Sequence, residues 1–212
     1  MKLATMITIA AAMALASNVN AAAKETAKDK TSTGRQVTVY RTAHSAIPYQ
    51  IEGAAMDEAS EMFADIGVSL VWRFGSPSRQ EAGSIAIEIV TGTPAKVMPG
   101  TLAYAFPYEG VHIRVFWDRI RDYATPREVL AHVMVHEITH ILEGEVRHSD
   151  EGIMKAHWTP ADLSALAIKP LGFAPEDVKL IFEGLDRREA GGAVTGPRTV
   201  TAAAIRTDAR GK

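Results

Sequence analysis

The stretch of sequence that decides the fold is HEITHILEGEVRHSDEGIM, residues 136–154. His136 and His140 are four positions apart in it, so on a helix both imidazoles project from one face and can bind the same ion. Neutral imidazole is a good zinc ligand, and a zinc ion with an open position lets its water ionise near neutral pH. Glu137 lies beside the pair and can take a proton from that water. The motif therefore predicts a Zn2+ site on a helix, with Glu137 as the general base.

A zinc site of this kind needs a third protein ligand, and the residues after the helix offer several. Gly144 is placed to reverse the chain, and four residues later His148 can lie over the metal. Glu143 and Glu145 are acidic alternatives, because carboxylates also bind zinc. We predict His148 as the third ligand and keep the two glutamates as alternatives.

The helix that carries the motif is also predicted from its boundaries. Thr125 can cap the first turn, Pro126 suits the first helical position, and Glu128 would complete a capping box. Gly144 suits a left-handed stop at the other end. We therefore expect one continuous helix from Thr125 to Gly144.

Two further histidines near the motif, His132 and His157, are expected to have structural roles. His132 lies one turn before His136 and could be a ligand in a shifted pair, but no glutamate follows it, which favours a supporting or core role. His157 follows the motif and could contact a substrate oxyanion, yet a structural role is favoured for it as well.

In the rest of the chain, the spacing of apolar residues is typical of a helix in some segments and of a strand in others. An amphipathic helix over residues 51–66, closed by Gly67, follows the first strand. Two more helices are predicted after the motif, beginning at Thr159-Pro160 and Ala174-Pro175. The predicted strands are residues 36–41, 68–74, 84–90, 102–106 and 111–117.

The run from His136 to Met154 resembles the signature of the metzincin metalloproteases, most of all the matrixin branch. The shared features are two helical histidines, a glycine turn, a third histidine followed by serine, and a methionine in a tight turn. The resemblance implies that His136, His140 and His148 are the zinc ligands and that Glu137 is the general base. It also implies that Met154 is the turn methionine beneath the metal.

The third-ligand loop is longer than the family pattern. His140 to Gly144 and Gly144 to His148 are each four positions, where the family has three. With this difference, the resemblance implies an α+β fold of the metzincin-like zincin type. Its parts would be a twisted mixed sheet, a backing helix, the active-site helix and a helical C-terminal part.

The likeness extends upstream to GTLAYAFPYEGVHIRVFWD, residues 100–118. This passage resembles the matrixin segment in which an edge strand that pairs with substrate leads through a loop into the next strand. An extended peptide could add itself there as another strand. The implied substrate edge consists of Leu102, Ala103, Tyr104 and Ala105.

The two ends of the chain differ in composition from its centre. Residues 1–21 combine a lysine, a short apolar run and a small-residue end, which is typical of a cleaved signal peptide. Residues 22–34 and 190–212 are rich in small and polar side chains, and we predict a flexible leader and a flexible tail. Residues 35–189 would form a single metalloprotease-like domain. We expect a secreted or periplasmic protein with no membrane association after signal cleavage.

Composition excludes several classes of protein. The formal net charge is −2 and the charges are interspersed, so no basic stripe for nucleic acid is present. The chain has no cysteine, which excludes disulfides and thiolate ligands and leaves His, Asp and Glu for any metal site.

These observations predict a zinc-dependent endopeptidase, a monomer that hydrolyses peptide bonds through a zinc-bound water. One alternative is a catalytically silent domain of the same fold that binds peptide or cell-envelope partners. Another is hydrolysis of a non-protein amide such as an envelope crosslink.

Overall fold

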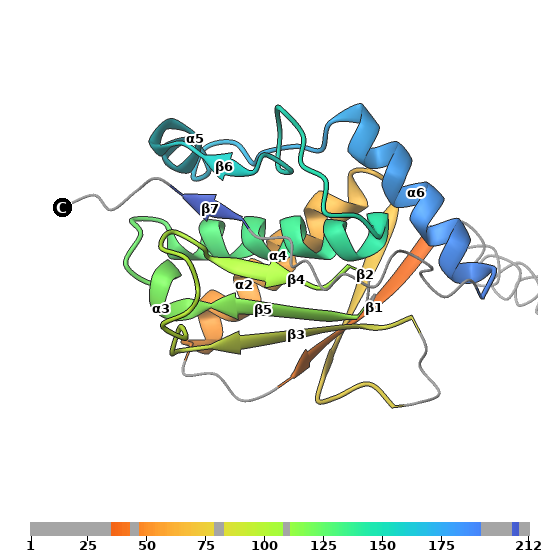
Figure 1. The fold of residues 1–212 in the computed structure, drawn as a ribbon, viewed down its shortest axis with the longest axis horizontal. Coiled ribbons are helices and arrows are strands. Elements are labelled where there is room, and N and C mark those ends of the chain that lie inside the picture. Colours follow the sequence, from red (N-terminus) through yellow and green to blue (C-terminus); the bar gives the residue numbers. More distant parts are fainter. Residues whose placement is uncertain (1–34, 43–46, 79–82, 108–110, 192–204, 208–212) are drawn as a thin grey trace, which may run out of the picture. The chain divides into compact units, whose positions relative to one another are not determined.

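A five-stranded mixed sheet forms the centre of the fold (Figure 1). Its strands run in the order β2-β1-β3-β5-β4, and every neighbouring pair is parallel except the antiparallel pair of β5 with the edge strand β4. The prediction of a strand, a helix and then four strands is confirmed. The strands are β1 (Arg35–Thr42), β2 (Val68–Phe74), β3 (Ile85–Val90), β4 (Ala103–Ala105) and β5 (His112–Phe116).

This computed structural model describes only part of the chain. The predicted signal peptide, residues 1–21, and leader, residues 22–34, lie outside it and stay predictions. The described residues are 35–42, 47–78, 83–107, 111–191 and 205–207.

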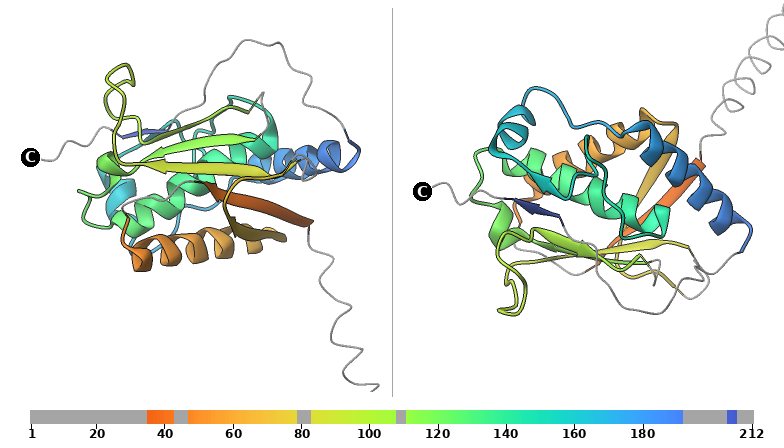
Figure 2. Two further views of the ribbon diagram at one scale, coloured as in Figure 1. Left: turned by 90° about the horizontal axis from the view of Figure 1, so that it is seen from below. Right: turned by 45° about the horizontal axis from the view of Figure 1, so that its top comes forward.

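Two helices cover one face of the sheet (Figure 2). The backing helix α2 (Tyr49–Ala64) buries Ala55, Ala59 and Phe63, which confirms the amphipathic helix expected there. Gly67 follows it with φ +82°, a left-handed conformation that suits a chain reversal. The second helix, α4 (Pro126–Glu143), packs against α2 and against β4 and β5.

Helix α4 begins and ends at the predicted residues, but its first turn is built differently. Thr125 is the N-cap, yet its side chain makes no capping hydrogen bond. Glu128 does not close a capping box either, because it pairs with the neighbouring Arg127, whose Nε is 3.1 Å from Oε1. The capping-box prediction is therefore wrong, whereas the left-handed stop at Gly144, with φ 74°, is confirmed.

Burial on every side distinguishes α4 from a surface helix. Every residue from Val129 to Glu143 is buried, so the helix has no solvent face. It lies between the sheet, α2 and α6 (Pro175–Glu189), which crosses it at Gly184. A side chain added at Gly184 would lie 1.7 Å from the carbonyl oxygen of Leu142, so only glycine permits this approach.

The C-terminal part is mainly helical, as predicted. Helix α5 (Pro160–Ala165) has a capping box between Thr159 and Asp162, and α6 begins at the predicted proline. A short helix that was not predicted, α3 (Trp117–Ile120), follows β5. Among the described residues, no helix combines the length and apolar character needed to cross a bilayer.

A second, two-stranded sheet includes residues 206–207, which lie within the predicted tail of residues 190–212. In it, β6 (His157–Trp158) pairs in parallel with β7 (Arg206–Thr207). Ile205, just before β7, is fully buried. Residues 205–207 are therefore part of the packed structure, because their backbone finds hydrogen-bond partners and Ile205 finds an apolar site. Residues 192–204 and 208–212 lie outside the described residues.

Candidate metal centre

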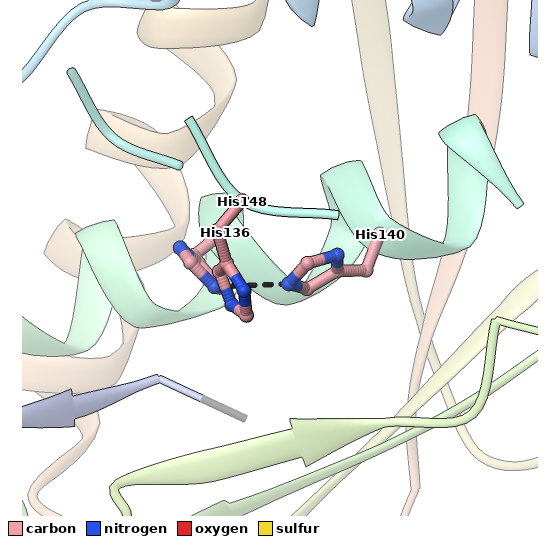
Figure 3. A group of neighbouring side chains, drawn as sticks. All are labelled: His136, His140 and His148. Carbon is pink, nitrogen blue, oxygen red and sulfur yellow. Dashed lines mark hydrogen bonds between the residues drawn. The ribbon is translucent and has the colours of Figure 1, made fainter. Parts of the chain in front are cut away.

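Three histidines converge at one point of the fold (Figure 3). His136 and His140 project from the same side of α4, and His148 reaches them from the segment after Gly144. One ring nitrogen from each lies within 4.8 Å of the others. His136 and His140 are buried and His148 is half-buried, so the group lies at the border between core and solvent.

The tautomers of the two helical histidines follow from their backbone contacts. Nδ1 of His136 is 2.8 Å from the carbonyl oxygen of Ile153, and Nδ1 of His140 is 3.1 Å from that of Glu145. A carbonyl oxygen only accepts, so each Nδ1 is assigned the hydrogen. Each Nε2 is then left with a lone pair directed into the cluster.

These two lone pairs face one another. The Nε2 atoms of His136 and His140 are 3.0 Å apart, the contact drawn as a dashed line in Figure 3. Burial lowers the pKa of His136 to about 3 and holds the pKa of His140 well below its usual value, so neither ring carries an extra proton at neutral pH. Two acceptors this close without a hydrogen repel each other, and a cation between them would remove the repulsion.

Zinc fits this donor set. Two nitrogens about 2.0–2.1 Å from a tetrahedral zinc ion are about 3.3 Å apart, close to the Nε2 separation. Nε2 of His148 is buried and has no hydrogen-bond partner among the described residues, which is the state of a nitrogen available to a metal. Three neutral imidazoles would leave the fourth position of the ion for water or substrate.

The acidic alternatives for the third ligand lie apart from this cluster. The described residues contain one group able to hold a metal, and it consists of the three histidines alone. Glu143 forms an ion pair with Arg147 at 3.5 Å, and Glu145 contributes its carbonyl oxygen to His140 rather than its carboxylate.

The segment carrying His148 is anchored to α6 from both sides. Arg147 and Ser149 both donate to Oδ1 of Asp177, a fully buried carboxylate in the first turn of α6. Oδ2 of Asp177 accepts the backbone N–H of Ala174 at 3.0 Å. Asp177 thus fixes both neighbours of His148. Sequence reasoning missed it, since its only local signal is that of a helix-capping acid.

Glu137 is fully buried between α4 and the sheet edge. Burial raises the pKa of its carboxyl well above the usual value, and the backbone N–H groups of Ile205 and Ala105 oppose this rise. A cation held by the neighbouring histidines would favour the carboxylate further. Oε2 accepts no hydrogen bond from a described residue and is therefore free to meet a water or a substrate group.

Met154 is fully buried in a turn that follows the His148 segment. Its carbonyl oxygen accepts the backbone N–H of Ser149 at 2.9 Å, which closes the loop that directly follows His148. The preceding carbonyl, that of Ile153, accepts from His136 and also from Nε1 of Trp158 at 3.3 Å. Ile153 therefore orients a predicted ligand through its backbone, which no side-chain pattern could have indicated.

His132 and His157 lie outside the cluster. His132 is buried, its Nδ1 donates to the carbonyl of Glu128 at 2.7 Å, and its Nε2 accepts the N–H of Leu171 at 3.0 Å. Both nitrogens are thus satisfied, in keeping with the structural role favoured for it. His157 is exposed in β6.

The predicted substrate edge coincides with β4 and the residue before it, at the edge of the sheet. The N–H of Ala105 is directed to the carboxylate of Glu137. The N–H of Leu102 donates to the carbonyl oxygen of Ile205 at 3.0 Å. The edge therefore touches both Glu137 and the C-terminal residues.

Comparisons with known proteins give a match in structure and none in sequence. No protein-family model matches the chain, and no curated protein matches it in sequence. Archaemetzincin from Methanopyrus kandleri superposes with a TM-score of 0.50 at 14% identity, over 72% of this chain and 96% of that one. The fold is zincin-like. A zinc-dependent peptidase from Methanocorpusculum labreanum gives a TM-score of 0.49 at 14% identity, over 68% of this chain and 99% of that one.

The likeness to archaemetzincin confirms the predicted fold class, an α+β domain with a twisted mixed sheet. At 14% identity it shows the fold alone. The chemistry of this chain has to be argued from its own residues.

Proposed function

We propose that this chain is a zinc-dependent endopeptidase of the metzincin type with a lengthened third-ligand loop. The observation that carries the proposal is the convergence of His136, His140 and His148, whose ligand atoms lie within 4.8 Å of one another. The facing lone pairs on two of these rings call for a cation, and the zincin-like fold supports the assignment.

The chain's own residues divide the chemistry between them. Zinc, when bound, supplies a Lewis acid that lowers the pKa of water at its open position. Glu137, next to His136 on α4, would act as the general base toward the attacking water and would pass the proton to the leaving nitrogen of the peptide bond. Burial of Glu137 keeps bulk water from competing for this proton. Asp177 and the carbonyl of Ile153 hold the imidazoles in place.

Metal analysis and a peptide-cleavage assay test the proposal together. Wild-type chain should bind one zinc ion and cleave a mixed-peptide or casein substrate, and a chelator should abolish cleavage. Glu137→Gln should keep its zinc and lose about 100- to 10,000-fold in kcat, the usual contribution of a general base. Equal cleavage by the two chains would remove Glu137 from the mechanism, and absence of zinc from both would remove the proposal.

The second candidate is a catalytically silent peptide-binding domain of the same fold. It is favoured by the engagement of the Glu137 carboxylate with two backbone N–H groups, those of Ala105 and Ile205. This candidate predicts stoichiometric zinc and binding of peptides, but no turnover over a broad peptide library. Chelator-sensitive hydrolysis would exclude it.

We also propose that the protein is exported and acts in the periplasm or outside the cell. The composition of residues 1–21 supports this. N-terminal sequencing of protein recovered from the producing cells should begin near residue 22, and an intact first residue in all fractions would contradict export.

A further inference from the structure

Residues 205–207 lie beside residues 100–102, which precede the edge strand of the large sheet. The N–H of Leu102 donates to the carbonyl of Ile205 at 3.0 Å, and the N–H of Thr207 donates to the carbonyl of Gly100 at 3.1 Å. Thr101 and Arg206 form the antiparallel bridge between these two bonds. The C-terminal residues thus pair antiparallel with residues 100–102, which lead directly into the edge strand β4.

The other side of the same three residues is also paired. β7 runs parallel to β6, with Arg206 opposite His157 and Thr207 opposite Trp158. The N–H of Arg206 donates to the carbonyl of Ala156 at 3.3 Å. Segments 100–102 and 156–158 therefore form the two walls of a groove, and residues 205–207 fill it.

This filled groove ends at the proposed catalytic base. The backbone nitrogen of Ile205 is 3.4 Å from Oε1 of Glu137. The side chain of Ile205 is fully buried in the core, with an exposed fraction of 0%. At the far end, the hydroxyl of Thr207 is hydrogen-bonded to that of Tyr123. The segment is held at its backbone, at one apolar side chain and at its end.

We propose that residues 205–207 occupy the groove in which an extended peptide substrate binds, and that the C-terminal segment thereby inhibits the chain in cis. The inference rests on the proposed function, since it assigns Glu137 as the base. An extended strand paired on both sides satisfies its backbone in the way a bound peptide would.

The direction of the segment indicates which part of a substrate it imitates. In the proposed hydrolysis, Glu137 delivers a proton to the leaving nitrogen of the cleaved bond. The nitrogen that faces Glu137 here is that of Ile205. Ile205 therefore takes the place of the residue directly after the cleaved bond, and Arg206 and Thr207 take the next two. The substrate class follows: extended peptides with an apolar, β-branched residue after the cleaved bond.

Full-length point variants test this inference. Ile205→Asp places a carboxylate in an apolar site beside Glu137, which should expel the segment. Ile168→Asp is the matched control, because it makes the same change at an isoleucine that is 89% exposed. Ile205→Ala, a milder change, should give an intermediate result. Zinc content and thermal unfolding of each variant show whether it is folded.

The first readout is binding of a free peptide with the sequence IRTDARGK, residues 205–212, measured by calorimetry. Ile205→Asp should bind it more tightly than the wild type and Ile168→Asp do, because in those two chains the tethered segment competes for the groove. A tethered segment acts at an effective concentration of about 1 mM, so the expected suppression is this concentration divided by the dissociation constant of the peptide. A constant of about 0.1 mM would correspond to about 10-fold higher kcat/KM for Ile205→Asp than for the wild type.

The two proposals fail in different ways. Equal peptide affinity and equal hydrolysis by the wild type and Ile205→Asp would overturn the inhibition and leave the peptidase in place. Peptide binding gained by Ile205→Asp without hydrolysis in any variant would support the filled groove and remove the peptidase. If Ile205→Asp does not retain zinc and fold, Ile205→Ala decides, and unchanged peptide binding by that variant overturns the inference.

Discussion

Replacing Glu143 with glutamine should stabilise the folded chain at neutral and alkaline pH. Glu143 has an exposed fraction of 1%, and neither of its carboxylate oxygens accepts a hydrogen bond from a described residue. Its ion pair with Arg147 is 3.5 Å long. Burial raises the pKa of Glu143 to about 8, against the opposing effect of Arg147.

The size of this stabilisation follows from the pKa of Glu143 in the folded chain and its ordinary pKa in the unfolded chain. Below the ordinary value of 4.5 the carboxyl is protonated in the folded and the unfolded chain, so the substitution should change little. Between 4.5 and about 8 the unfolded chain ionises first, and the wild type loses about 1.4 kcal/mol of stability per pH unit. The loss amounts to about 3 kcal/mol at pH 7 and about 5 kcal/mol above pH 8. Glutamine does not titrate, so the variant avoids this loss.

Urea unfolding with a chelator present, at about pH 5, 7 and 9, measures the effect without a contribution from metal binding. Glu183→Gln on α6 is the matched control, because Glu183 is exposed and its stability should change by less than about 0.5 kcal/mol. Asp177 continues to pair with Arg147 in the variant, so no cation is left alone. Parallel stability curves for the wild type and Glu143→Gln across this pH range would refute the reasoning.

Three further substitutions test the centre and its support. His148→Ala leaves two imidazoles, so zinc content after dialysis should fall well below one per chain, and retention of full zinc would contradict its role as a ligand. Asp177→Asn weakens the anchor of the His148 segment and should lower zinc affinity about 10- to 100-fold in a chelator competition, with all ligands still present. Gly184→Ala places a methyl group 1.7 Å from the carbonyl of Leu142 and should lower the free energy of unfolding by about 1–3 kcal/mol. Gly53→Ala, with nothing within 4 Å, should be neutral or stabilise by up to about 1 kcal/mol, and equal urea midpoints for the two variants would contradict the close approach.

Local patterns were enough to predict most of the elements. The strands of the large sheet follow from short apolar runs, which parallel strands buried within a sheet require. The position of α4 follows from Pro126 at its start and Gly144 at its end. The details of the first turn did not follow, because the exposed Arg127 competes for Glu128.

What the sequence did not reveal depends on contacts between distant residues. β7 pairs with a strand about 50 positions earlier, and its few residues have no period of their own. Asp177 reaches the neighbours of His148 from a different helix. Backbone carbonyls that orient the histidines, such as that of Ile153, leave no mark in side-chain chemistry. The histidine motif could be located in advance, whereas the residues that orient it could not.

Because α4 is buried on all sides, it should open far more slowly than residues 205–207, although both lie at the same centre. Amide hydrogens in this helix can exchange with deuterium only when the surrounding packing opens as a whole, so their protection should approach the limit set by global unfolding. Residues 205–207 are held by a short strand and can open by themselves. Two of the three imidazoles thus belong to the helix that opens most slowly, whereas the entry of a ligand depends on the faster opening of residues 205–207.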